Sequence, residues 1–157
     1  MKQKKGFTLA ELLIVVAIIA VLVSISIPIF SKQLEKSRDA ASVANIRSAY
    51  AEAMTTIMTD DTSKSHWTSD SVHHVWVNYN ASKGYVDTID VVVNIESKKQ
   101  NNWSGEGDNL PSPLNTIKDN KSAGQYLLVI NFDASGQPAG AALIAVIDAW
   151  KKDPKLQ

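Results

Sequence analysis

The sequence predicts an α+β protein in which a long amino-terminal stem helix, first transmembrane and then amphipathic, packs against an antiparallel sheet of about four strands. Three observations predict this fold. Twelve consecutive residues, Leu12 to Val23, carry no polar side chain. Residues 31–58 contain neither Gly nor Pro and repeat apolar side chains at helical spacing. The rest of the chain alternates runs rich in β-branched residues with turn-forming residues.

The apolar part of the stem is long enough to cross a membrane. Phe7 to Phe30 is 24 residues, or about 36 Å of helix, and a bilayer core of about 30 Å requires about 20 apolar residues. A cluster of three lysines, Lys2, Lys4 and Lys5, precedes this segment. Lysine on one flank predicts that the amino end stays cytoplasmic. We therefore expect a single-pass membrane protein with its carboxyl-terminal part outside.

Glu11 is unusual, because it lies at the start of this apolar segment. A carboxylate at the centre of a membrane helix costs about 2.5–3.5 kcal/mol, and less near the interface. An ordinary cleaved signal peptide, with 24–26 as a small-x-small site, does not explain the acid, and neither does an uncleaved anchor. Either of these would make the protein a secreted or membrane-tethered binding module.

The residues around Glu11 resemble a known processing signal. The string KGFTLAE, residues 5–11, followed by the apolar helix, resembles the class III signal of type IV pilins and pseudopilins; the resemblance covers residues 4–30. It implies that a prepilin peptidase cuts between Gly6 and Phe7 and then methylates the new amino terminus, giving methylphenylalanine. Glu11 becomes the fifth mature residue, as in the family.

The resemblance also divides the chain into four parts. Residues 1–6 are the expected leader peptide, 7–30 the transmembrane and assembly half of the stem, 31–58 its amphipathic half, and 59–157 an extracellular β-rich head. Before assembly the head would lie outside a single-pass membrane protein. Afterwards the protein would form part of a cell-surface pilus (a fimbrium) or an envelope pseudopilus.

The expected function follows from the charges at the new terminus. The amine of Phe7 and the carboxylate of Glu11 lie one helical turn apart, and buried charges cost less free energy when they are paired. We expect Glu11 to bind the amine of a neighbouring copy and set the axial register, as one buried polar group sets register in coiled coils. The chain would then be a structural prepilin of a type IV pilus. The alternative within the family is a pseudopilin of a type II secretion or DNA-uptake (competence) system.

The partners that the resemblance implies are further copies of the chain in a helical filament, the prepilin peptidase, and an assembly ATPase with its platform protein. Pro28, the twenty-second mature residue, lies in a β-branched, serine-bearing stretch. An interior proline removes a helix hydrogen bond. We therefore expect a kink or local melting of the helix at this position.

The amphipathic half should continue the helix from about Thr8 to about Met58. Its predicted apolar stripe consists of Leu34, Ala41, Ile46, Tyr50, Met54 and Ile57, widened by Val43 and Ala53. The predicted polar positions are Lys32, Glu35, Lys36, Arg38, Asp39, Arg47 and Glu52.

The head should contain strands at 72–79, 85–95 and 125–132. The segment 139–147 favours a fourth strand, although its alanines also suit a helix that ends at Trp150. Residues 80–84 are expected to be a hairpin loop. The long polar stretch between the two strand pairs carries Leu110, Leu114 and Ile117, which suggests that it docks on the core.

Composition argues against several other functions. Sixteen basic and 16 acidic residues give no net charge, so no nucleic-acid site is evident, and without cysteine no disulfide forms. Gram-negative pilins usually have a disulfide near the carboxyl terminus, so this chain departs from them. We expect neither an enzyme nor a cofactor or metal. The histidines and loop acids favour solvated side chains (His66, His73, His74; Asp108, Asp119, Asp133), and the tryptophans favour core or edge packing (Trp67, Trp76, Trp103, Trp150).

Overall fold

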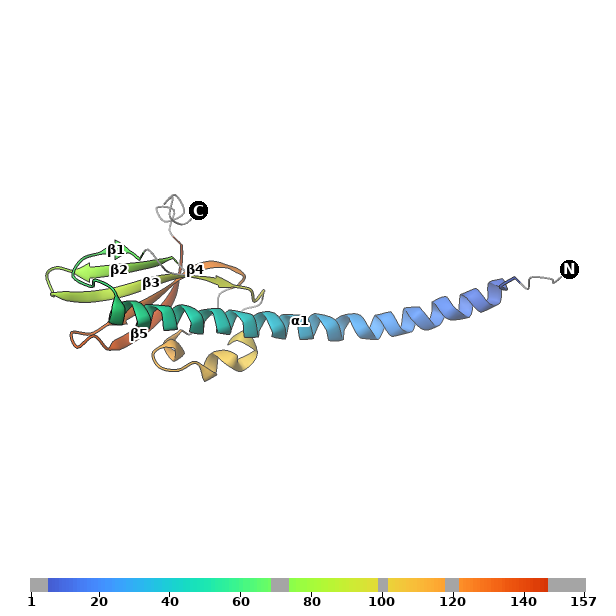
Figure 1. The fold of residues 1–157 in the computed structure, drawn as a ribbon. Coiled ribbons are helices and arrows are strands. Elements are labelled where there is room, and N and C mark those ends of the chain that lie inside the picture. Colours follow the sequence, from blue (N-terminus) through green and yellow to red (C-terminus); the bar gives the residue numbers. More distant parts are fainter. Residues whose placement is uncertain (1–5, 69–73, 99–101, 118–121, 147–157) are drawn as a thin grey trace. The chain divides into compact units, whose positions relative to one another are not determined.

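A computed structural model describes residues 6–68, 74–98, 102–117 and 122–146 of the 157-residue chain. The chain divides into two compact units, residues 1–35 and 36–157. The elements follow the order α1, β1, β2, β3, two short 3₁₀ helices (η1 and η2), β4 and β5 (Figure 1). The predicted α+β class is confirmed.

α1 (Leu9–Thr59) is one helix of 51 residues, and its bounds lie within a residue of those predicted. It forms because its only helix-breaking residue is Pro28. Its last backbone hydrogen bond runs from the N–H of Asp60 to the carbonyl of Thr56, at 2.9 Å. The helix ends there because Asp60 begins a run of turn-forming residues.

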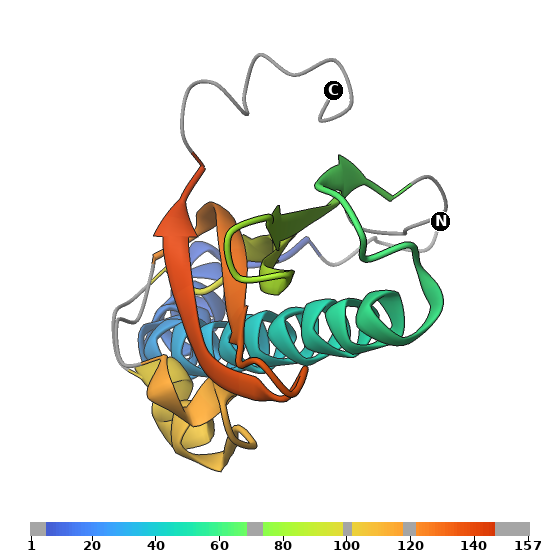
Figure 2. The same cartoon turned by 90° about the vertical axis from the view of Figure 1, so that its left-hand side faces the viewer.

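The sheet has five antiparallel strands that pair in chain order (Figures 1 and 2). They are β1 (His66–Trp67), β2 (Val75–Asn80), β3 (Tyr85–Ile95), β4 (Gly124–Phe132) and β5 (Pro138–Ala145). The prediction of about four strands missed β1. Two residues are too short to show an alternating pattern, so only pairing with β2 reveals this strand.

The predicted strand bounds hold for β3 at both ends and shift elsewhere. β2 begins at Val75 rather than Val72, and residues 72 and 73 lie outside the described residues. The segment from 139 is a strand through Ala145, so the strand interpretation is confirmed there, whereas 147–150 lie outside the described residues. The hairpin loop before β3 closes at Gly84, whose φ of 78° favours glycine.

The core of residues 36–157 lies between one face of the sheet and the carboxyl half of α1, with the strands lying across one side of the helix (Figure 2). Ala49 and Ala53 are fully buried on the helix, and their small side chains allow the sheet to approach closely. Fully buried side chains on the sheet face this part of α1 (Val75, Val77, Ile89, Val91, Leu128, Ile130). Because alternate strand residues point to one face, Val75 and Val77 of β2 are buried against the helix, whereas Trp76 and Asn78 between and after them are not buried.

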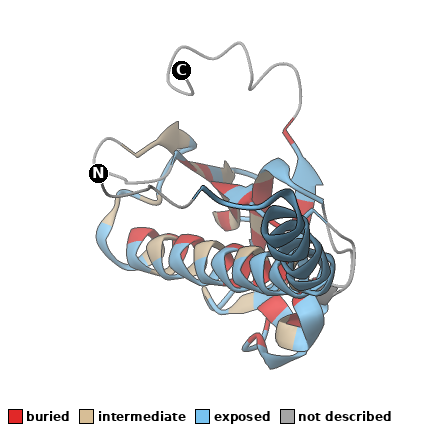
Figure 3. Ribbon diagram, turned by 90° about the vertical axis from the view of Figure 1, so that its right-hand side faces the viewer, coloured by how far each residue is buried: buried red, intermediate tan, exposed pale blue. Residues whose placement is uncertain are grey.

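The predicted apolar stripe of α1 is partly wrong. Leu34 is 52% exposed and Ala41 is exposed, whereas Asp39 is fully buried and Glu35 is 8% exposed. From residue 39 onward the buried face recurs every three or four residues (Asp39, Ser42, Ile46, Ala49, Ala53, Thr56), as Figure 3 shows by its alternating colours. The buried face is therefore polar where it begins and apolar further along.

Asp39 is buried because two hydroxyl groups satisfy its carboxylate. Ser97 Oγ donates to its Oδ1 at 2.6 Å, and Ser104 Oγ donates to its Oδ2. One turn along α1, the Ser42 hydroxyl accepts hydrogen bonds from the backbone N–H groups of Glu96 (2.9 Å) and Ser97 (3.0 Å). These bonds attach the segment after β3 to the helix, which the sequence pattern of α1 alone does not indicate.

The long connection between β3 and β4 contains η1 (Asn102–Asn109) and η2 (Leu114–Thr116). Leu110, Leu114 and Ile117 are all buried, so the prediction that this segment docks on the core is confirmed. Thr116 Oγ1 donates to the carbonyl of Ala141 at 2.9 Å and accepts from its N–H at 3.2 Å. Thr116 therefore covers part of the open edge of β5.

Candidate processing and assembly site

The start of α1 is closed by a reciprocal pair of hydrogen bonds. Thr8 immediately precedes the first helical residue, and its backbone N–H donates to Glu11 Oε2 at 2.8 Å. The backbone N–H of Glu11 in turn donates to Thr8 Oγ1 at 3.3 Å. This is a capping box, in which residues three apart satisfy backbone donors that the helix leaves unpaired. The T-x-x-E spacing of this capping box is present in the sequence, whereas the role predicted for Glu11 was assembly alone.

The Thr8 hydroxyl makes a further bond to the same carboxylate, donating to Glu11 Oε2 at 2.7 Å. The hydrogen bonds to this carboxylate from the described residues thus all end on Oε2. An acid bonded in this way is less costly at the edge of an apolar segment than an unpartnered one. Glu11 therefore has a local role in one isolated chain, and its other oxygen can accept from a group outside the chain.

The two residues at the expected cleavage point are exposed. Phe7 is 81% exposed. A Cβ atom added at Gly6 would meet nothing within 4 Å, so the local structure of this chain leaves room for a side chain there. Residues 1–5, with the three lysines, lie outside the described residues.

The apolar half of α1 is exposed on all sides. Its large apolar side chains from Phe7 to Phe30 are between 45% and 81% exposed. The helix is long and apolar enough to cross a membrane by length and composition, and none of its most apolar window is buried within the protein. An exposed apolar surface of this extent indicates contact with lipid or with other protein chains.

Polar groups within the apolar half are bonded locally. Ser24 and Ser26 donate their hydroxyl hydrogens to the carbonyls of Val21 and Leu22, each at 2.7 Å. α1 continues through Pro28, which has no N–H to donate to the carbonyl four residues earlier. A weak point in the backbone ladder is therefore present, although the helix is continuous.

Among the other candidate residues, His66 is half-buried and bonded on both ring nitrogens. Nε2 lies 3.0 Å from Asp60 Oδ2 and Nδ1 lies 3.0 Å from the carbonyl oxygen of Lys64. Both partners are acceptors, so both contacts are hydrogen bonds only when the ring carries two protons. The bond to the Lys64 carbonyl, followed by the interactions with Asp60, raises the pKa of His66 above its usual value. His66 is therefore not a free surface imidazole.

The remaining candidates do not converge. His74, Asp108 and Asp133 are exposed, while His73 and Asp119 lie outside the described residues. Within the described ranges, no three His, Cys, Asp or Glu side chains gather into a possible metal site.

The tryptophans differ in their surroundings. Trp67 and Trp76 pack edge to face across β1 and β2, with ring centroids 5.3 Å apart. Trp103, within η1, is fully buried, and Trp150 lies outside the described residues. Core and edge packing is confirmed for the three tryptophans that the structure describes.

The exposed apolar helix, its capped acid and the sheet that packs on its carboxyl half indicate a structural, membrane-anchored protein. Residues 1–27 match a family model described as the prokaryotic N-terminal methylation motif. This motif is the class III signal of type IV pilins and pseudopilins, so the resemblance found in the sequence is confirmed for the amino-terminal segment and supports a type IV pilin-like protein in general. The match covers the amino-terminal segment only, and no solved structure matches the chain.

Proposed function

We propose that the chain is a prepilin, the precursor of a structural subunit of a type IV pilus, with no catalytic role. A prepilin peptidase would remove residues 1–6 and methylate Phe7, and an assembly ATPase with its platform would add the mature chain to a helical fibre. The observation that carries this proposal is the exposed apolar half of α1 with a single hydrogen-bonded acid at its start. Such a surface can leave the lipid only if other apolar helices replace it.

Glu11 would give this apolar packing a defined register. Cleavage removes three lysines, which leaves 13 basic and 16 acidic side chains (16 − 3 = 13; 13 − 16 = −3) and creates an amine on Phe7. The Thr8 bonds on Oε2 would hold the Glu11 carboxylate in place while the amine of a neighbouring copy approaches. Charge-assisted hydrogen bonds are roughly twice as strong as neutral ones. Non-directional apolar contact would supply cohesion, and this pair would set the axial position.

Pro28 would supply the weak point in the assembled fibre. With no N–H at Pro28, the carbonyl of Ser24 lacks its usual helix partner. The proposed consequence is local melting of the helix around Pro28 when the fibre forms or stretches.

The first experiment is mass spectrometry of the mature amino terminus. Methylated Phe7 supports the prepilin proposal. A chain that begins at Ile27 would instead indicate an ordinary secretory signal, and an intact Met1 an unprocessed anchor.

Electron microscopy then separates pilus from pseudopilus, because the motif is common to both groups of proteins. Long surface fibres labelled by an antibody to this chain support the pilus subunit. Labelling confined to the envelope, without surface fibres, supports a pseudopilin. The same labelling on intact cells tests whether residues 59–157 lie outside.

A further inference from the structure

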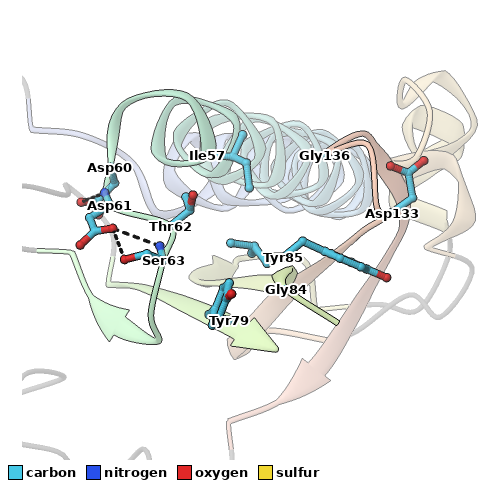
Figure 4. Close-up of a pocket in the computed structure, with 11 residues that line it drawn as sticks. Ile57, Asp60, Asp61, Thr62, Ser63, Tyr79, Gly84, Tyr85, Asp133 and Gly136 are labelled. Atoms are coloured by element: carbon cyan, nitrogen blue, oxygen red, sulfur yellow. Dashed lines mark hydrogen bonds between the residues drawn. The ribbon is translucent and has the colours of Figure 1, made fainter. Parts of the chain in front are cut away.

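A cleft that plays no part in the proposed assembly lies at the end of residues 36–157 where α1 stops. Its volume is about 630 Å³, within the range of about 300–1,000 Å³ typical of ligand sites. Three connections line it, namely the loop after α1, the β2–β3 turn and the β4–β5 turn (Figure 4). Gly84 and Gly136 leave it open, since a Cβ at either would meet nothing within 4 Å.

Two tyrosines and an isoleucine give the cleft its apolar surface. Figure 4 shows Ile57 and Tyr85 between the loop that carries Asp61 and the turn that carries Asp133. Tyr79 and Tyr85 are both half-buried, and neither phenolic hydroxyl makes a hydrogen bond within the described part of the chain. The Lys83 ammonium lies over one face of the Tyr85 ring, 5.8 Å from its centroid. A ligand can therefore pack against the other face of Tyr85 and against Tyr79, and the two hydroxyls can bond to it.

The carboxylates of the cleft are hydrogen-bond acceptors with one oxygen already used. Asp61 Oδ1 accepts from the backbone N–H of Ser63 at 3.0 Å, and Asp133 Oδ1 accepts from that of Ser135 at 2.8 Å. Hydroxyl and backbone bonds within these turns lower the pKa of both acids, so both are ionised at neutral pH. Their Oδ2 atoms can accept from a ligand.

The charges around the cleft favour a neutral ligand. Asp60 is paired with His66 at 3.0 Å, Asp61 lies 3.9 Å from Lys64, and Asp87 is paired with Lys83 at 2.7 Å beside the cleft. The Lys64 ammonium offsets part of the negative potential that would attract a cationic ligand, and His66 offsets more of it when its ring is protonated. None of the described residues that line the cleft is basic, which disfavours an anionic ligand.

We propose that this cleft binds a short neutral carbohydrate. The tyrosine rings would pack against the C–H faces of the sugar, and the carboxylate oxygens would accept its hydroxyl hydrogens. Hydrogen bonds to charged groups are stronger than those between neutral groups. This proposal does not depend on fibre assembly.

The test uses full-length protein in a detergent without a sugar headgroup. Saturation-transfer NMR would measure binding of maltotriose, cellotriose, mannotriose and tri-N-acetylchitotriose. We expect at least one trisaccharide to bind with a millimolar Kd. Tyr85→Ala removes a ring, whereas Asp61→Asn keeps the oxygen that accepts from Ser63; each should weaken binding about tenfold or more. The control Tyr126→Ala removes a half-buried tyrosine that does not line the cleft, and should leave binding unchanged.

Three results would overturn the proposal. The first is no saturation transfer to any of the four sugars. The second is binding that Tyr126→Ala weakens as much as Tyr85→Ala and Asp61→Asn do. The third is tighter binding of the cationic probe spermidine than of any of the four sugars, with spermidine binding lost in Asp61→Asn. Because Asp61→Asn changes an exposed side chain, loss of binding in that variant is not explained by unfolding.

Discussion

Asp90 should make the protein less stable at neutral pH than in weak acid. Asp90 lies on β3 between Trp76 of β2 and Val129 of β4, on the sheet face away from α1. Its Oδ1 atom is buried without a hydrogen-bond partner in the described part of the chain. Burial raises the pKa of Asp90 from 3.8 to about 6, although a hydrogen bond with Thr88 acts in the opposite direction.

The sign and the size of this stability change follow from the linkage between proton binding and folding. Between pH 3.8 and about 6 the unfolded chain ionises at this residue while the folded chain keeps its proton, so the free energy of unfolding falls as pH rises. Each pKa unit corresponds to about 1.4 kcal/mol, which gives roughly 2–3 kcal/mol at pH 7.5. Asp90→Asn keeps the shape without the charge, so it should be more stable than the parent by about 2 kcal/mol at neutral pH and nearly equal to it in acid.

The assay is urea unfolding of the full-length protein in micelles, followed by near-ultraviolet circular dichroism in acid and at neutral pH. Asp87→Asn is the matched control, because a hydrogen bond from Lys83 lowers the pKa of Asp87. Loss of the Asp87 charge should therefore destabilise the protein at neutral pH, whereas loss of the Asp90 charge should stabilise it. The reasoning is refuted if Asp90→Asn and the parent have equal stability at neutral pH, or if a difference between them persists unchanged in acid.

The remaining predictions concern assembly, the His66 contacts and the core. Glu11→Ala should leave membrane insertion and cleavage intact but abolish fibres in electron micrographs. Thr8→Val, which costs the helix cap about 1 kcal/mol, should still form them, and normal Glu11→Ala fibres would contradict the proposed register. Because the pKa of His66 is raised, its contacts should stabilise the protein fully in weak acid and be lost as pH rises through the raised pKa. Thermal melts of His66→Gln should lack this pH dependence, and an unchanged profile would count against the charged ring. Trp103→Ala, which empties a fully buried site, should destabilise the protein by about 3–5 kcal/mol in urea; a loss below about 1 kcal/mol would mean that Trp103 is not part of the core.

Local signals were sufficient for much of the fold and for part of the candidate site. β3 was predicted at both ends because its β-branched run is bounded by Gly84 and Glu96. The capping role of Glu11 is also a local signal, because the T-x-x-E spacing joins residues only three apart, although the role predicted for Glu11 was assembly alone.

Other features depend on residues far apart in the chain. β1 exists only because His66 and Trp67 meet Val77 and Trp76. The cleft requires three connections to meet, and no one of them shows it by itself.

The sequence by itself determined the long helix, its apolar first half and the processing motif, because helical periodicity, hydropathy and short motifs are properties of neighbouring residues. Only the tertiary structure decided which face of α1 is buried. Asp39 lies inside because Ser97 and Ser104, 58 and 65 residues away, donate hydrogen bonds to its carboxylate. A buried carboxylate is stable only where such donors meet it, and helical spacing along α1 carries no information about donors that the rest of the chain supplies.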